Sequence, residues 1–162
     1  MILEFGVFEG NSINYFSQRL PDKKFIGFDS FLGLEESWKN VNTGYFNVDG
    51  RMPKVNPNVR LIAGWFEDSL PKFIEESKHA LENLIMIHLD ADTYKPTKTV
   101  LNLLNPYMKP GLIILFDEFM GYVGFQNHEF RAFLEFVEEH KINFEWLAYN
   151  RGNGEQVAVR II

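Results

Sequence analysis

Short apolar runs alternate with segments of helical periodicity along most of the chain. Phe130, Phe133, Leu134 and Val137 recur at positions i, i+3, i+4 and i+7, which is typical of a helix with one apolar face. The whole pattern predicts strands at 2–7, 24–29, 59–63, 84–90, 111–117, 144–149 and 157–162, and further helices at 11–19, 71–82 and 97–107. This alternation predicts an α/β fold with a doubly wound, mostly parallel sheet.

Local signals refine the ends of these elements. Asn11 or Ser12 is expected to cap the helix at 11–19, and Pro71 is expected in the first turn of its helix. The turn residues Arg151, Gly152, Asn153 and Gly154 predict an antiparallel hairpin at the C-terminal end. The connection at about 31–57 is rich in Gly, Asn and Pro, and connections of this length are usually functional or disordered.

Composition limits the range of functions. The 162 residues, 46% of them apolar, predict a single domain over 1–162 with one full core. The net charge of -6 argues against nucleic acid as a partner, because phosphate binding needs concentrated Lys and Arg. No apolar run approaches the roughly 18–20 residues that span a bilayer, so we expect no membrane association and a cytoplasmic location. The absence of cysteine excludes thiolate metal sites.

Two buried strands run directly into acidic residues. The strand at 84–90 leads to Asp90 and Asp92, and the strand at 111–117 leads to Asp117 and Glu118. Parallel strands end at the same edge of a sheet, where ligands of open α/β sheets bind. Hard oxygen donors at this edge point to Mg²⁺ or a similar divalent cation, with a solvated loop start as the alternative for Asp117 and Glu118.

The turn after the first strand indicates a cofactor site. Glu4 is followed by Gly6 and Gly10, a spacing that permits close backbone approach and leaves helix amides free for an anionic group. The turn lacks the third glycine of the dinucleotide fingerprint, which weighs against an NAD-dependent oxidoreductase. Asp29 ends the second strand, where an acid accepts hydrogen bonds from ribose hydroxyls. Apolar surface suited to an adenine ring, or to plain core packing, follows the third strand at Gly64, Trp65, Phe66 and Glu67.

Five segments together resemble a known family. They are EFGVFEGNS (4–12), GFDSFLGL (27–34), GWFEDSLP (64–71), HLDADTY (88–94) and FDEF (116–119). They resemble the macrocin-type (TylF-family) O-methyltransferases, class I enzymes that use S-adenosylmethionine to methylate antibiotic sugars and aminocoumarins. The resemblance implies a Rossmann-like sheet of seven strands with the last strand antiparallel. It also implies that Mg²⁺ is held by Asp90, Asp117 and Glu118, and S-adenosylmethionine by Glu4, Gly6, Gly10, Ser12, Asp29, Ser30, Gly64, Trp65, Phe66 and Glu67.

The sequence departs from that family in two places. The family usually has Asp-Asp where this chain has Asp117 and Glu118. Relatives also carry a helical segment before the first strand, whereas Met1 here directly precedes it. A short enzyme, a truncated reading frame, or a chain that relies on a partner subunit in a homo-oligomer would each account for the missing cover.

Methyl transfer from a sulfonium requires a positioned acceptor and a base for its proton. Asp90 or Asp92 is the expected base, although Asp92 could instead cap the following helix. His88 lies within an apolar run and is expected to be a core histidine with a satisfied hydrogen bond. His128 is a candidate for contact with the substrate, with a plain helix start as the alternative.

The sequence therefore predicts a metal-assisted O-methyltransferase that acts on a small hydroxylated molecule such as a sugar. An NAD-dependent oxidoreductase and a non-catalytic S-adenosylmethionine-binding remnant are the alternatives.

Overall fold

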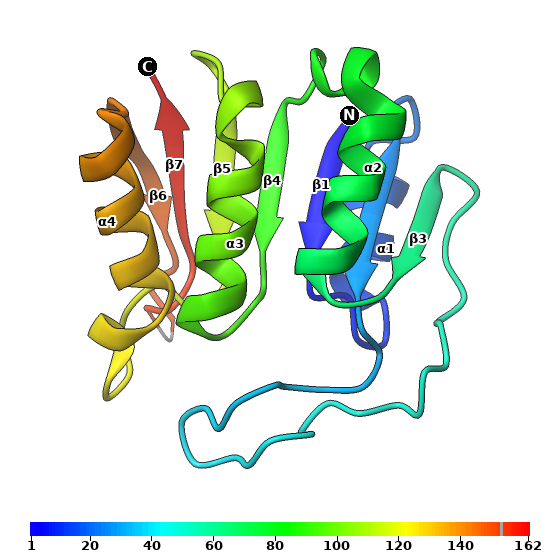
Figure 1. Cartoon of the computed structure of the whole chain (residues 1–162), viewed down its shortest axis with the longest axis horizontal. Coiled ribbons are helices and arrows are strands. Elements are labelled where there is room, and N and C mark those ends of the chain that lie inside the picture. The colour runs from blue at the N-terminus through cyan, green and yellow to red at the C-terminus, as the bar shows by residue number, and fades with distance from the viewer. Residues whose placement is uncertain (153) are drawn as a thin grey trace.

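The computed structural model describes residues 1–152 and 154–162 of the chain, which form one sheet with helices on both faces (Figure 1). The strands lie in the order β3-β2-β1-β4-β5-β7-β6. The first five strands in this order, from β3 to β5, pair in parallel with their neighbours. Strand β7 is antiparallel to both of its neighbours, β5 and β6. Their bounds are β1 (Ile2–Phe5), β2 (Phe25–Asp29), β3 (Val59–Ala63), β4 (Met86–Leu89), β5 (Ile113–Phe116), β6 (Phe144–Tyr149) and β7 (Val157–Ile161). The predicted seven-stranded, doubly wound fold is confirmed.

Four α-helices and two short 3-10 helices accompany the strands in the described residues. They are α1 (Asn11–Arg19), α2 (Phe66–Leu81), α3 (Tyr94–Leu104), η1 (Asn105–Tyr107), η2 (Phe125–Asn127) and α4 (Glu129–His140). Helices α2, α3 and α4 cover one face of the sheet, and α1 lies behind the other (Figure 1). None of the helices in residues 1–152 and 154–162 is long and apolar enough to cross a membrane.

The core explains why the strands read as continuous apolar runs. Leu3 and Phe5 of β1 belong to a large cluster under α2, α3 and α4, whereas Ile2 belongs to a smaller cluster that includes Ile13 of α1. Side chains of a strand alternate between faces, so a strand in the middle of a sheet covered on both sides is buried at every position. Residues 2–5 are all buried accordingly.

Two helices begin earlier than the sequence predicts. The expected starts were residues 71 and 97, whereas α2 begins at Phe66 and α3 at Tyr94. Glu67 and Asp68 lie in the first turn of α2, where acidic side chains complement the helix dipole. Pro71 therefore lies inside the helix, and its expected place in the first turn is wrong.

The expected cap of α1 is also wrong. Gly10 is the N-cap, with a left-handed φ of 80°, and no side chain caps the helix. The hydroxyl of Ser12 donates to Glu4 Oε1 at 2.9 Å instead, because the helix starts directly above the end of β1. The predicted C-terminal hairpin is present as β6 and β7, although Asn153 of its turn signal lies outside the described residues.

Residues 31–57, the strap, first run along the edge of the sheet at which the parallel strands end and then return beside β3 to the start of that strand (Figure 1). Within the strap, Leu32 pairs with Asn47 and Trp38 pairs with Val41 in isolated antiparallel bridges. Its side chains also reach the rest of the fold, since Lys39 Nζ lies 3.0 Å from Glu155 Oε2. The long connection is thus a placed segment that contacts the C-terminal part of the chain.

Candidate cofactor and metal site

A cleft of about 830 Å³, its open mouth included, lies at the carboxyl ends of the parallel strands. Part of its wall comes from the strap, through Gly33, Leu34, Glu35 and Phe46. Of the residues predicted to bind cofactor, metal or the acceptor proton, the cleft is lined by Gly6, Asp29, Ser30, Trp65, Phe66, Glu67, Asp90 and Asp92.

Gly6 brings the end of β1 against the end of β4. Its φ is +92°, and a Cβ at this position would lie 1.8 Å from the carbonyl oxygen of Asp90. Only glycine permits this approach, because any side chain would meet backbone that the sheet holds in place. The turn after β1 and the backbone of Asp90 therefore lie in direct contact and fix each other's position.

Gly6→Ala should destabilise the protein by about 3 kcal/mol or more, because it adds a backbone clash to an unfavourable left-handed conformation. Gly44→Ala is the matched control, since Gly44 has a φ of +82° with nothing within 4 Å of the added Cβ. We expect Gly44→Ala to cost about 1–2 kcal/mol. Urea denaturation measures the free energy of unfolding of both variants, and an equal loss of stability in the two would contradict the close approach at Gly6.

Asp29 organises the backbone around the cleft. Its Oδ2 accepts hydrogen bonds from the amides of Val7 and Phe8, both at 2.7 Å, and its Oδ1 accepts one from the amide of Phe31 at 2.7 Å. A carboxylate has about four acceptor positions, so roughly one is left for a ligand hydroxyl. Asp29 thus fixes both the turn after β1 and the start of the strap.

Glu4 lies beneath the cleft and does not line it. Only 1% of its surface is exposed, and it bonds to Ser12 and to His88 Nδ1, the latter at 3.0 Å. Burial opposes protonation of His88, but the hydrogen bond and charge of Glu4 outweigh it and raise the pKa of His88. His88 is the satisfied core histidine that the sequence predicts. Gly10, Ser12 and Gly64 likewise lie outside the lining of the cleft.

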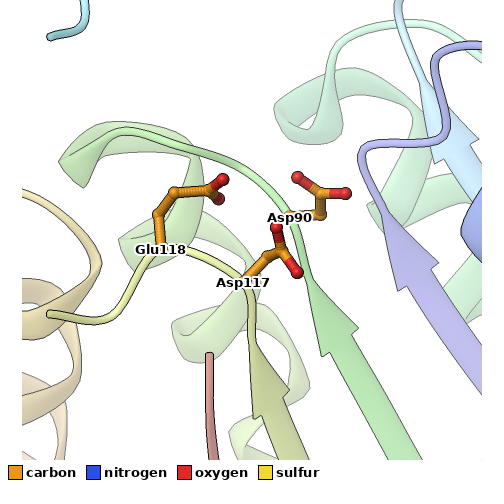
Figure 2. A group of neighbouring side chains, drawn as sticks. All are labelled: Asp90, Asp117 and Glu118. Atoms are coloured by element: carbon orange, nitrogen blue, oxygen red, sulfur yellow. The ribbon is translucent and has the colours of Figure 1, made fainter. Parts of the chain in front are cut away.

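Three acidic side chains converge from two strand ends (Figure 2). One carboxylate oxygen each from Asp90, Asp117 and Glu118 lies within 4.8 Å of the other two. Oxygens on opposite sides of an ion are about 4.2 Å apart for Mg²⁺ and about 5 Å apart for Ca²⁺. Three oxygens on one ion lie closer together than this 4.8 Å limit, so the carboxylates would move slightly toward one another to share a cation.

The electrostatics of this group favour a bound proton or cation. Burial raises the pKa of Asp90 and of Glu118, and repulsion from neighbouring acids raises them further. Glu118 Oε2 is buried and has no hydrogen-bond partner among residues 1–152 and 154–162. A buried acceptor that lacks a donor is costly, and a divalent cation would satisfy it.

Asp92 stands beside this group and lines the cleft, with 6% of its surface exposed. Burial and the charge of Asp117 raise the pKa of Asp92 to about 7. The N-cap of α3 is Thr93, so the alternative that Asp92 caps this helix is wrong. Asp92 has a φ of 61° instead, a left-handed conformation that turns the chain between β4 and α3.

His128 takes the helix-start position that the sequence left as an alternative, as the N-cap of α4. Its ring lies 6.2 Å from that of Tyr122, and burial lowers the pKa of His128. Lys39 of the strap lies over the rings of Tyr122 and Trp38, at 4.4 and 4.0 Å. These aromatic residues join the strap to the loop after β5, a contact that no sequence pattern signals.

Sequence reasoning missed Glu129, which lies directly behind the acidic group. It is fully buried, and its carboxylate accepts hydrogen bonds from the amides of Ala91 and Glu118. An acid just before an apolar helix pattern normally indicates a solvated first turn. Only the buried position of the start of α4 distinguishes this residue.

Comparison with known proteins identifies the class. Residues 3–119 match a protein family described as "Methyltransferase domain", and the chain belongs to this family. The chain is also 28% identical, over 124 residues, to the uncharacterized protein R132 of Acanthamoeba polyphaga mimivirus. The match covers 74% of this chain and 52% of R132, so the chain spans about half the length of this relative.

Solved methyltransferase structures share the fold. The calicheamicin methyltransferase CalS11 superposes with a TM-score of 0.74 at 22% identity, covering 98% of this chain and 71% of CalS11. The O-methyltransferase NovP gives a TM-score of 0.69 at 19% identity, covering 98% of this chain and 70% of NovP. MycE of mycinamycin biosynthesis, in complex with Mg and SAH, gives 0.62 at 12% identity, covering 99% of this chain and 44% of MycE.

Proposed function

We propose that this chain binds S-adenosylmethionine in the cleft and transfers its methyl group, with the help of a divalent cation, to a hydroxyl of a small molecule such as a sugar. The observation that carries the proposal is the contact between the Gly6 turn and Asp90. This contact brings the cofactor cleft and the three converging acids to one place at the edge of the sheet. Membership of the methyltransferase domain family supports it, and so do the similar structures described as O-methyltransferases.

The residues around the cleft fit the parts of this cofactor. Asp29 keeps an acceptor position for a ribose hydroxyl, and Trp65 and Phe66 offer apolar surface for the adenine ring. When bound, S-adenosylmethionine supplies an electrophilic methyl group on its sulfonium. Gly6 lines the cleft at the end of β1, and the strap limits access of water from the other side.

Asp90, Asp117 and Glu118 are the residues that would hold the cation. The unpartnered Glu118 Oε2 and the raised pKa values of Asp90 and Glu118 both fit that role. A bound divalent cation such as Mg²⁺ lowers the pKa of a hydroxyl and orients it. The three side chains would hold this cation beside the cleft. A substrate with vicinal hydroxyls would suit the cation best.

Asp92 is the proposed general base, with Asp90 as the alternative. A base works best when its pKa lies near the working pH, and without a bound cation burial and the charge of Asp117 raise the pKa of Asp92 to about 7. Asp92 lines the cleft, where its carboxylate would accept the proton of the acceptor hydroxyl.

The cofactor part is tested by calorimetric titration with S-adenosylhomocysteine and with NAD. We expect S-adenosylhomocysteine to bind and NAD not to bind. Asp29→Ala should weaken S-adenosylhomocysteine binding by about 1.5–3 kcal/mol, because it removes a charged hydrogen-bond acceptor. Asp22→Ala, at an exposed position, should leave the affinity unchanged. The reverse ranking of the two ligands would move the assignment to an oxidoreductase.

The reaction is tested by mass spectrometry of a panel of sugars and phenols incubated with S-adenosylmethionine. Transfer should require Mg²⁺ and stop when a chelator removes it. Binding of S-adenosylhomocysteine without methylation of any compound would instead favour a non-catalytic binding module.

A further inference from the structure

Glu129 connects the two turns that carry the acidic residues. It is the first residue of α4, and none of its surface is exposed. Its Oε1 accepts the N–H of Ala91 at 3.3 Å, and its Oε2 accepts the N–H of Glu118 at 3.2 Å. Ala91 lies between Asp90 and Asp92, so a single carboxylate joins the turn after β4 to the turn after β5.

These two hydrogen bonds begin where the sheet stops. The amide of Asp90 donates to Phe5 O at 2.8 Å, and the amide of Asp117 donates to Leu89 O at 2.8 Å. Asp90 and Asp117 are the first residues after β4 and β5. The amides of the residues that follow them, Ala91 and Glu118, donate to Glu129. Glu129 thus extends the pairing of the two strands by one residue, into the turns themselves.

The chemistry of the side chain is specific to a carboxylate. Both of its oxygens accept a backbone N–H, whereas an amide side chain presents one oxygen and one NH₂ donor. Burial of a further acid beside Asp90, Asp92 and Glu118 costs free energy. An apolar residue would be enough at this position if its only role were to pack the start of α4 against the fold. The position of Glu129 therefore serves the acidic group.

We infer that Glu129 is a positioning residue that holds the turn of Asp90 and the turn of Glu118 at the spacing at which both can bind one divalent cation. This inference rests on the proposed cation site. Residues that orient metal ligands in this way typically change metal affinity by about 10–100-fold when replaced. Glu129 itself is not counted among the cation ligands, because the acids whose oxygens lie within 4.8 Å of one another are Asp90, Asp117 and Glu118.

The test compares Glu129→Gln with Phe136→Leu in the full chain. Phe136 is equally buried on the same helix, but its ring contact is with His140, away from both turns. Hydrogen exchange without metal should show at least about tenfold faster exchange at Ala91 and Glu118 in Glu129→Gln, and no change there in Phe136→Leu. Calorimetric titration with Mg²⁺ should show about 10–100-fold weaker binding in Glu129→Gln alone.

The outcomes separate this inference from the proposed function. If the wild-type chain binds Mg²⁺ and Glu129→Gln binds it equally well, the inference is overturned while the cation site stands. If the wild-type chain binds no Mg²⁺, the proposed cation site fails and the cation part of the inference fails with it. Hydrogen exchange then still decides whether Glu129 holds the turns. Glu129→Asp, which keeps the charge but is one methylene shorter, should show the same losses if Glu129→Gln does not fold.

Discussion

Asp92→Asn should leave the protein folded and able to bind S-adenosylhomocysteine, and lower kcat for methyl transfer by about 10²–10⁴-fold. The amide has the shape of the carboxylate but cannot accept the acceptor's proton. Initial rates with an acceptor found in the panel measure the effect, and S-adenosylhomocysteine titration checks that the cleft is intact.

Asp68→Asn is the control for this change. Asp68 is an exposed acid in the first turn of α2, outside the lining of the cleft, and its replacement should leave kcat unchanged. If Asp92→Asn keeps its rate and Asp90→Asn loses it without losing Mg²⁺ affinity, the base is Asp90 and our assignment of Asp92 is wrong.

Without divalent cations, the protein should lose stability as the pH rises above about 4. The pKa values of Asp90, Asp92 and Glu118 are raised in the folded state by burial and mutual repulsion. The folded state therefore binds more protons than the unfolded state, so this stability is present at low pH and lost as the pH rises through the folded pKa values. For Asp92 the loss runs from about pH 4, near its ordinary pKa, to about pH 7, its pKa in the folded protein. Each unit of pKa shift is worth about 1.4 kcal/mol, which predicts a total loss of a few kcal/mol.

Mg²⁺ should remove most of that pH dependence, because it replaces the protons that the acidic group otherwise needs. Urea denaturation at several pH values, with Mg²⁺ or with a chelator, measures it. Part of the slope should survive with Mg²⁺, since Glu4 also raises the pKa of His88. Glu118→Gln should flatten the slope without metal and weaken the response to Mg²⁺. A slope that Mg²⁺ does not change would argue against a cation at these three residues.

The features that follow from topology could be predicted from the sequence. Parallel strands end at one edge, so apolar runs that stop at Asp90 and at Asp117 had to bring their acids together. The same reasoning placed Gly6 and Asp29 at the cleft. These predictions need only the order of the elements and the period of two along a strand.

Features that depend on packing between distant segments could not be predicted. Serine is a common helix cap, yet the hydroxyl of Ser12 donates to Glu4, because α1 lies over the end of β1. Glu129 reads as an ordinary first-turn acid until α4 is placed against the turn of Ala91, 38 residues away in sequence. The pairing of Lys39 with Glu155 spans 116 residues and has no local signal.

The way in which the strap is fastened sets how the cleft can exchange its contents. Ion pairs link Lys39 to Glu155 at 3.0 Å and Lys95 to Glu35 at 3.0 Å, and all four side chains are partly in contact with solvent. Such pairs are weak and screened by salt, whereas the β-sheet beneath is held by buried apolar contacts. Phe31 and Trp38 of the strap are also buried. The strap can therefore loosen at its ion pairs while these two residues stay in place, and the rate of this local opening should depend on ionic strength more than the stability of the protein does.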